Sequence, residues 1–121
     1  LGHIRRRKTL FIYLFDMYMK NSYTVRMIKN FASKETEKIY HQRFSAKLPQ
    51  SIQKIALRKL IMLDNASCLE DLRVPPANRL EQLSGDRQGQ YSIRINQQYR
   101  ICFRLEGKDS ISDVEIVDYH T

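Results

Sequence analysis

The sequence predicts an α+β fold, in which two or three helices from the N-terminal half pack on one face of an antiparallel sheet of about four to five strands. Two observations lead to this prediction. Apolar residues between positions 50 and 63 recur at spacings of three and four, as in an amphipathic helix. Apolar and polar residues alternate between positions 91 and 105, as in half-buried strands. Helices followed by a run of strands are typical of α+β proteins.

Length and cysteine content limit the range of functions. The 121 residues are enough for one domain with one core. No segment approaches the run of about 20 apolar residues that a transmembrane helix needs. The two cysteines, Cys68 and Cys102, lack the paired spacing of a zinc site and fit a reducing cytosol. No phosphate-binding loop or nucleophile motif is present either. From the cysteines we expect a cytoplasmic protein, and from the missing motifs one that needs no metal and no other cofactor.

The net charge of +8 favours an acidic partner, of which nucleic acid is the commonest. This charge is unevenly distributed along the chain. Residues 1–26 contain six basic residues and one acidic residue, a net charge of +5, whereas residues 27–121 contain fifteen basic and twelve acidic residues, a net charge of +3. The charge of the whole chain therefore overstates how basic the predicted domain is.

Residues 1–26 differ from the rest of the chain, because a basic RRRK cluster precedes the apolar run TLFIYLF. A signal peptide would explain this order, although no small-residue cleavage site follows. A membrane-surface helix is a second interpretation, although its apolar run would be short. We favour a third, an upstream extension or cloning remnant that forms a short helix or an added strand if it is ordered. The functional domain would then be residues 27–121.

Two helices are predicted after a short strand at residues 27–31. Ser33 fits the N-cap of the first helix, which has two glutamates in its first turn and ends between residues 41 and 44. Pro49 suits the start of the second helix. The basic residues off its apolar stripe are expected on a solvated face: Lys54, Arg58 and Lys59.

The segment after the second helix contains signals for a short turn, a loop and an edge strand. Ser67 and Glu70 have the spacing of a capping box for one further helical turn. Pro75 and Pro76 are expected to force an extended loop. Residues 78–83 would then re-enter the sheet as an edge strand, with both leucines directed inward.

A hairpin formed by residues 91–95 and 100–105 is the centre of the predicted sheet, and residues 111–117 form its last strand. One face of the hairpin is apolar, while the other carries Arg94, Arg100 and Arg104. Arginines fixed on strands form a plausible phosphate-binding surface. Further arginines that could join this surface are Arg79 and Arg87. The alternative is an ordinary solvated strand face with ion pairs.

Two groups of residues could transfer protons. The C-terminal sequence Asp118-Tyr119-His120 contains a histidine, the usual general acid or base near neutral pH. A chain terminus of this kind is more often without function. Glu81 with His41 is a second conceivable acid–base pair, although no spacing requires it.

These residues resemble the HigB toxins of the RelE/ParE superfamily. The matching features are the MIKNF segment, a helix that closes with LDNAS, the run GDRxGxYSIRINxQYRICF, and the terminal VEIVDYH. The resemblance covers about 95 residues from Met27 onward. It implies a RelE-like fold with a curved sheet. It also implies the toxin of a type II toxin–antitoxin system, acting as a metal-independent, ribosome-dependent endoribonuclease on messenger RNA.

The resemblance also assigns residues. Arg100 matches the family arginine that stabilises the scissile phosphate, and Asp118, Tyr119 and His120 match the C-terminal catalytic cluster. Glu81 and Ser84 stand where well-studied relatives have a histidine and a lysine, so Glu81 could replace the missing base. We therefore expect a weaker nuclease, or one with an altered codon preference.

The remaining arginines of the predicted surface would bind RNA. Expected partners are a helix-turn-helix antitoxin of the HigA type, the ribosome and messenger RNA, and no membrane. Two alternatives remain: a ParE-like toxin that binds DNA gyrase without cutting RNA, and a weakly active module that mainly binds its antitoxin.

Overall fold

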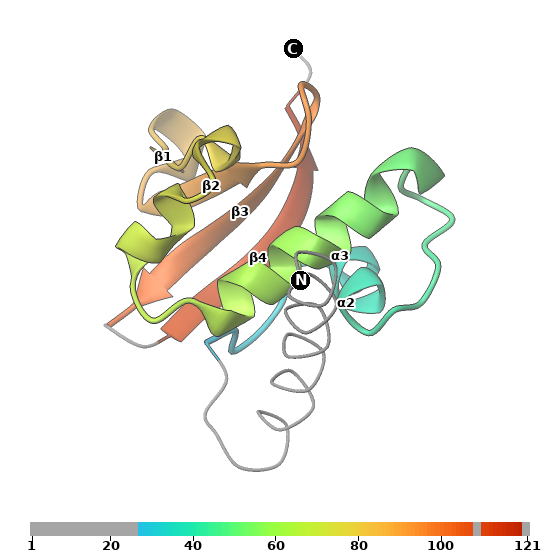
Figure 1. The fold of residues 1–121 in the computed structure, drawn as a ribbon, viewed down its shortest axis with the longest axis horizontal. Coiled ribbons are helices and arrows are strands. Elements are labelled where there is room, and N and C mark those ends of the chain that lie inside the picture. Colours follow the sequence, from blue (N-terminus) through green and yellow to red (C-terminus); the bar gives the residue numbers. More distant parts are fainter. Residues whose placement is uncertain (1–26, 108–109, 120–121) are drawn as a thin grey trace, which may run out of the picture.

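This computed structural model of the protein describes residues 27–107 and 110–119, and it confirms the α+β architecture. The extension predicted for residues 1–26 and the terminal His120 lie outside the described residues. Helices α2 (Lys34–Tyr40) and α3 (Gln50–Asn65) pack on one face of a sheet (Figure 1). The sheet contains four strands in sequence order, each antiparallel to its neighbour: β1 (Glu81–Gln82), β2 (Gln90–Arg94), β3 (Tyr99–Glu106) and β4 (Ser110–Asp118).

The first described segment adds a rudimentary fifth strand, as the sequence predicted. Ile28 and Phe31 form isolated parallel bridges to β4, at Ile111 and Val114. The carboxylate of the buried Asp64 at the end of α3 accepts hydrogen bonds from the Ile28 amide (3.1 Å) and the Tyr40 hydroxyl (2.6 Å). One buried carboxylate therefore joins the first segment, α2 and α3.

Helix α2 begins where its cap was predicted. The Ser33 hydroxyl accepts a hydrogen bond from the Thr36 amide at 3.3 Å, which satisfies one of the amides that a helix N-terminus leaves unpaired. The helix ends at Tyr40, one residue before the predicted range. Gln42 then has a φ of 62°, a left-handed conformation that turns the chain away from the helix axis.

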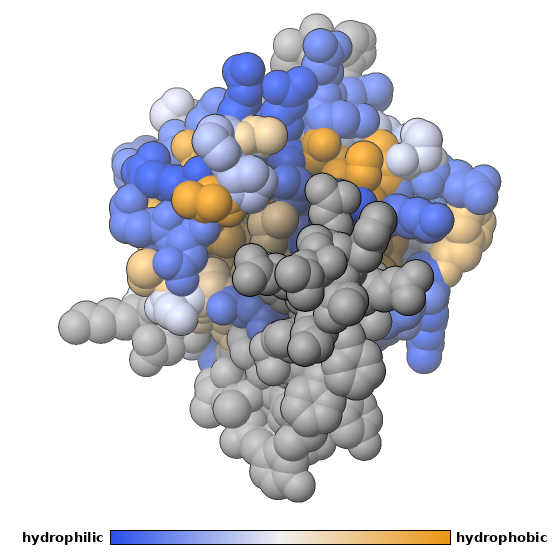
Figure 2. Space-filling view, viewed as in Figure 1, coloured by the Kyte–Doolittle hydropathy of each residue, from blue (hydrophilic) through white to orange (hydrophobic). Residues whose placement is uncertain are grey.

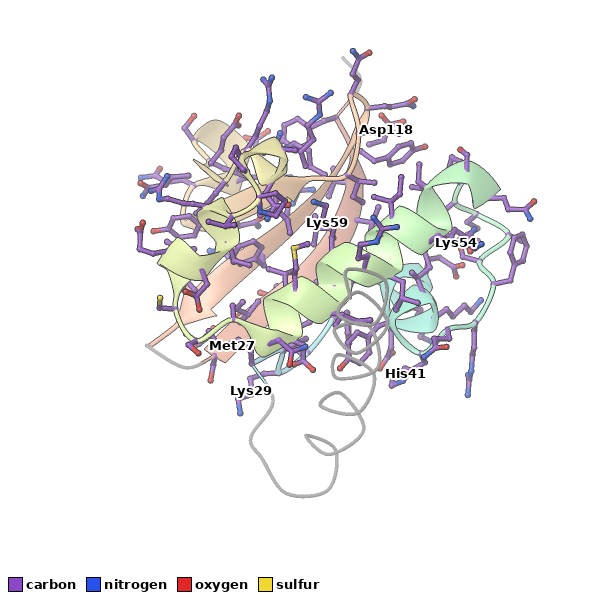
Figure 3. The ribbon with its side chains drawn as sticks, viewed as in Figure 1. Met27, Lys29, His41, Lys54, Lys59 and Asp118 are labelled. Carbon is purple, nitrogen blue, oxygen red and sulfur yellow. The ribbon has the colours of Figure 1, made fainter. Side chains whose placement is uncertain are left out.

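Helix α3 supplies the apolar stripe that covers the sheet. Four of its apolar residues are buried: Ile52, Ala56, Leu60 and Leu63. They belong to the same core as Ile93, Ile101 and Phe103 of the sheet, which have no exposed surface. The predicted solvated position of Lys59 is wrong. Its side chain is buried, and its ammonium donates a hydrogen bond to the side-chain carbonyl of Asn78. Figure 3 shows Lys59 on α3.

The connection from α3 to the sheet differs from the prediction in two respects. The predicted capping box is absent, because Cys68, not Ser67, precedes the short 3-10 helix η1 (Leu69–Arg73) and makes no capping bond to its backbone. The residues after Pro75 are not an extended loop, because Pro76–Asn78 form a second 3-10 turn, η2. A proline suits the first position of such a turn, where its missing amide is not needed.

The edge strand is shorter than predicted. Arg79 follows η2 with a φ of 44°, and this left-handed residue keeps the chain out of the sheet until Glu81. Beyond β1, a third 3-10 turn, η3 (Gly85–Arg87), leads into β2. At the other edge, Asp113 has a φ of 53° where β3 and β4 shift register, so β4 contains a bulge.

Candidate active site on the arginine face

The sheet face opposite the helices carries the predicted arginines. Register places Arg94 directly opposite Arg100, Ser92 opposite Cys102, and Gln90 opposite Arg104. Residues directly opposite in an antiparallel pair point to the same side of the sheet. We call this surface the arginine face: Ser92, Arg94, Arg100, Cys102, Arg104 and Glu115.

The centre of the arginine face is buried, although α2 and α3 lie on the other face of the sheet. Neither Ser92 nor Cys102 has any exposed surface. Arg87, which ends η3, donates from Nη1 to Gln90 Oε1 of β2 at 3.0 Å and lies 3.5 Å from Glu115 Oε1 of β4. Since β3 lies between those strands, the Arg87 side chain spans it. Long polar side chains therefore shield the small residues at the centre, and this burial raises the pKa of the Cys102 thiol.

Arg100 is held rigidly on this face. Its Nε donates to the Ser92 hydroxyl at 2.7 Å, and its Nη2 donates to the Arg79 carbonyl at 2.6 Å. Only 11% of the side chain is exposed. None of the described residues accepts a hydrogen bond from Nη1. The guanidinium is therefore fixed by its Nε and Nη2 groups, while Nη1 retains its donors for an anion.

The support for Arg100 extends through η2 to helix α3. The Lys59 ammonium donates to the Asn78 side-chain carbonyl, and the Asn78 amide group donates to the Leu72 carbonyl at 3.0 Å. Asn78 has no exposed surface and immediately precedes Arg79, whose carbonyl holds Arg100. Burial lowers the pKa of Lys59 below its ordinary value, and the nearby Arg58 lowers it further.

Two other predicted residues lie beside Arg100. Glu81 Oε2 is 3.9 Å from Arg100 Nη2, and its side chain is 55% exposed. The pKa of the Tyr119 hydroxyl is raised, first by burial and then by Cys102. The same hydroxyl also interacts electrostatically with Arg87, Arg100 and Glu81, the arginines opposing the increase. Tyr119 is held by its amide, which donates to the Gln98 carbonyl at 2.6 Å. The structure thus brings Arg100, Tyr119 and Glu81 together.

The other predicted residues are distributed around this centre. Arg94 is half-buried beside Arg100, and its guanidinium forms no hydrogen bond or ion pair within the part of the chain that the structure describes. Arg104 lies further along β3, with its Nε 3.6 Å from the Asp113 carboxylate. Gly89 leaves room for Arg104, because a Cβ there would lie 2.9 Å from Arg104 Nη1. The exposed Arg79 contributes its carbonyl, not its guanidinium, to Arg100.

Asp118 is separated from this group. It pairs with Tyr99, which packs against the helix-side core, so Asp118 lies on the face opposite Arg100. Its carboxylate accepts a hydrogen bond from the Gln98 side chain at 3.1 Å. The alternative partner of Glu81, His41, follows α2 on the helix side of the molecule (Figure 3). The structure does not bring His41 to Glu81.

Sequence reasoning missed Ser92 and Glu115. The hydroxyl of Ser92 binds Arg100, and the carboxylate of Glu115 pairs with Arg87. Alternation along β2 placed Ser92 on the correct face, but its burial depends on side chains from other segments. No sequence signal linked Glu115 to Arg87, which is 28 residues away in the chain.

Comparison with known proteins identifies the family. The sequence model of the HigB-like toxins, described as RelE-like toxins of type II toxin–antitoxin systems, matches residues 29–120. The chain belongs to this family. It is therefore a toxin of a type II toxin–antitoxin system, and its partner is an antitoxin.

Two relatives extend this comparison. The chain is 43% identical to Toxin HigB-1 of Vibrio cholerae over 79 residues, which cover 64% of this chain and 83% of that toxin. It is 41% identical to an uncharacterized protein of Haemophilus influenzae over 64 residues, which cover 53% of this chain and 63% of that protein. The similarity to Toxin HigB-1 agrees with the family assignment.

Two further properties concern possible cofactors and membranes. Within residues 27–107 and 110–119, no three His, Cys, Asp or Glu side chains are grouped so that they could hold a metal ion. Among the helices of the described chain, none has the length and hydropathy to span a membrane.

Proposed function

We propose that the protein is a ribosome-dependent endoribonuclease that inhibits translation by cutting messenger RNA. Such cleavage is the known activity of HigB toxins. The observation that carries the proposal is the arrangement around Arg100. A guanidinium with bonded Nε and Nη2 groups lies close to a tyrosine hydroxyl and a carboxylate on one sheet face.

The reaction is an intramolecular phosphoryl transfer within the RNA. The 2′-hydroxyl loses its proton to a base, and its oxygen attacks the adjacent phosphorus. The bond from phosphorus to the 5′-oxygen breaks, and that oxygen takes a proton. The products are a cyclic phosphate and a free 5′-hydroxyl. The catalyst must move two protons and stabilise the negative charge that develops on the phosphate.

The described residues suit these requirements. Arg100 would bind the scissile phosphate through Nη1, while Arg79, Arg87, Arg94 and Arg104 would bind other parts of the RNA. Glu81, which is exposed, would accept the proton of the 2′-hydroxyl. Tyr119, whose pKa is raised, keeps its proton near neutral pH and would donate a hydrogen bond to a phosphate oxygen.

His120 is included in the proposal because of the resemblance of the terminal DYH, whereas Asp118, which lies on the face opposite Arg100, is assigned no step of the reaction. His120 would supply the proton to the leaving oxygen. We further propose an antitoxin of the HigA type as partner, and action in the cytoplasm on ribosomes that are translating messenger RNA.

Primer extension on messages translated by purified ribosomes tests the proposal. Wild-type protein should produce discrete cleavage sites, and Arg100→Ala should lower the cleavage rate by about 10²–10³-fold, the loss typical of a transition-state charge donor. His120→Gln should also lower the rate. Arg73→Ala is the matched control, because Arg73 is exposed on η1 and forms its ion pair with Glu70 of the same turn.

Because Arg100 also supports the sheet, the thermal midpoint of each variant must be measured in parallel. Cleavage by a folded Arg100→Ala variant at the wild-type rate would contradict the proposal. Inhibition of DNA gyrase supercoiling without RNA cleavage would instead indicate a ParE-like activity.

A further inference from the structure

The connection between α2 and α3 exposes a large apolar side chain. Phe44 is 64% exposed, and it borders a hollow of about 470 Å³ between the two helices. The apolar floor of this hollow includes Ile39 and Leu57. Figure 2 shows hydrophobic atoms at the edge of the molecule over this connection, flanked by hydrophilic residues. A solvent-facing phenylalanine beside an apolar hollow is typical of a protein-binding surface.

The backbone around Phe44 is fixed. The next residue, Ser45, has no exposed surface, and its hydroxyl donates to Glu35 of α2 at 2.6 Å. Gln53 of α3 binds both the amide and the carbonyl of Ser45. Gln42, two residues before Phe44, has a positive φ, a conformation that is costly for this residue type. The loop is therefore held in one conformation that directs Phe44 outward.

The rim of the hollow is positively charged. Arg43 and Lys54 line it, and Arg43 also lines an adjacent hollow with Lys34, Lys38 and Glu37. These two hollows thus present four basic side chains and one acidic side chain. Lys54 and His41 mark this end of the molecule in Figure 3. A partner with acidic side chains around an apolar one would be complementary to this surface.

We propose that this surface, the Phe44 surface, binds an acidic amphipathic segment of the antitoxin. The segment inserts an apolar side chain beside Phe44 and places carboxylates near Arg43 and Lys54. An apolar hollow with a basic rim favours such a segment over RNA, which offers no aliphatic side chain to fill it. The surface lies on the helix side of the sheet, away from the arginine face. The inference rests on the family's antitoxin partnership and is independent of the proposed nuclease activity.

Isothermal titration of the toxin with the antitoxin encoded beside its gene tests this proposal. The double variant Phe44→Ser with Lys54→Glu should weaken binding by about 30-fold or more, the effect of losing one hot-spot contact. The matched control is Val74→Ser with Lys29→Glu. Val74 is 72% exposed on another loop, and Lys29 is exposed on the first segment. This control should bind with wild-type affinity.

Wild-type antitoxin affinity in the folded double variant would overturn the proposal. If that variant had also lost binding to ribosomes, the Phe44 surface would be assigned to RNA. The single variant Lys54→Glu, at an exposed helix position, provides the same comparison if the double variant does not fold. A loss of affinity in Arg87→Glu but not in either Phe44-surface variant would place the antitoxin on the arginine face.

Discussion

The two faces of the sheet are buried by different means. On the helix face, Ile93, Ile101 and Phe103 are fully buried because α3 lays its apolar stripe over them. On the arginine face, Ser92 and Cys102 are equally buried, but long polar side chains of the sheet and its loops cover them. One face is shielded by apolar packing, and the other by a network of guanidinium and carboxylate groups.

This difference explains how the surface proposed to bind RNA can also be structural. Apolar packing is non-directional and depends on the area buried. Hydrogen bonds to a guanidinium fix its orientation, so the covering side chains of the arginine face are held ready for the RNA that we propose they bind. Substitutions on the helix face should therefore affect mainly stability, whereas those on the arginine face should affect mainly cleavage.

The largest predicted effect compares adjacent residues on opposite faces. Phe103→Ala should lower the free energy of unfolding by about 3–5 kcal/mol, because it removes a fully buried aromatic ring. Cys102→Ala, which removes a single sulfur atom, should cost about 1 kcal/mol. Urea denaturation of both variants measures the contrast. Equal losses in the free energy of unfolding would show that the two faces contribute equally to stability, against this prediction.

The second prediction concerns the link between the faces. Lys59→Met should lower the free energy of unfolding by about 1–3 kcal/mol, because it leaves the buried Asn78 carbonyl without its donor. The pKa of Lys59 is lowered in the folded state, so below 10.5 the unfolded chain binds this proton more readily than the folded chain. The wild type should therefore gain stability relative to Lys59→Met as pH rises toward 10.5. Denaturation at several pH values checks the sign, and a constant difference would contradict it.

Tyr119→Phe should have a smaller effect, confined to cleavage. Loss of one hydrogen-bond donor to the phosphate should reduce the rate about tenfold, with little change in stability. Because the raised pKa keeps the hydroxyl protonated, the ratio of wild-type to variant rates should stay constant between about pH 6 and 9. Single-turnover cleavage at several pH values measures this ratio. A ratio that falls to one by pH 9 would show that the hydroxyl ionises within this range.

The smallest predicted effect is that of Glu115→Gln. The Arg87–Glu115 pair has partly exposed side chains and a separation of 3.5 Å, so its loss should cost about 0–1 kcal/mol. The variant should remain folded, and Cys102 should gain solvent access if this pair shields it. The rate of alkylation at Cys102 measures that access, in a Cys68→Ser background because Cys68 is an exposed free thiol. A destabilisation similar to that of Phe103→Ala would mean that the arginine face is held as strongly as the core.

The antiparallel hairpin, both helices and the separation of the two sheet faces were predictable from the sequence. Such features depend on local periodicity and on caps such as Ser33, and both are properties of neighbouring residues. The grouping of arginines on one face follows from the same alternation. The family resemblance, carried by short motifs, was confirmed by comparison.

Only the tertiary structure decided which polar residues are buried and which of them meet. Lys59 lies on the buried side of its helix, three residues after Ala56 and four before Leu63, but it meets its partner Asn78 only because η2 folds over that position. Asp118 and Tyr119 are neighbours in the chain but lie on opposite faces, because side chains alternate along a strand. Arg100 depends on Ser92 and Arg79, which are 8 and 21 residues away. Such contacts arise when distant segments pack together, so local sequence patterns do not encode them.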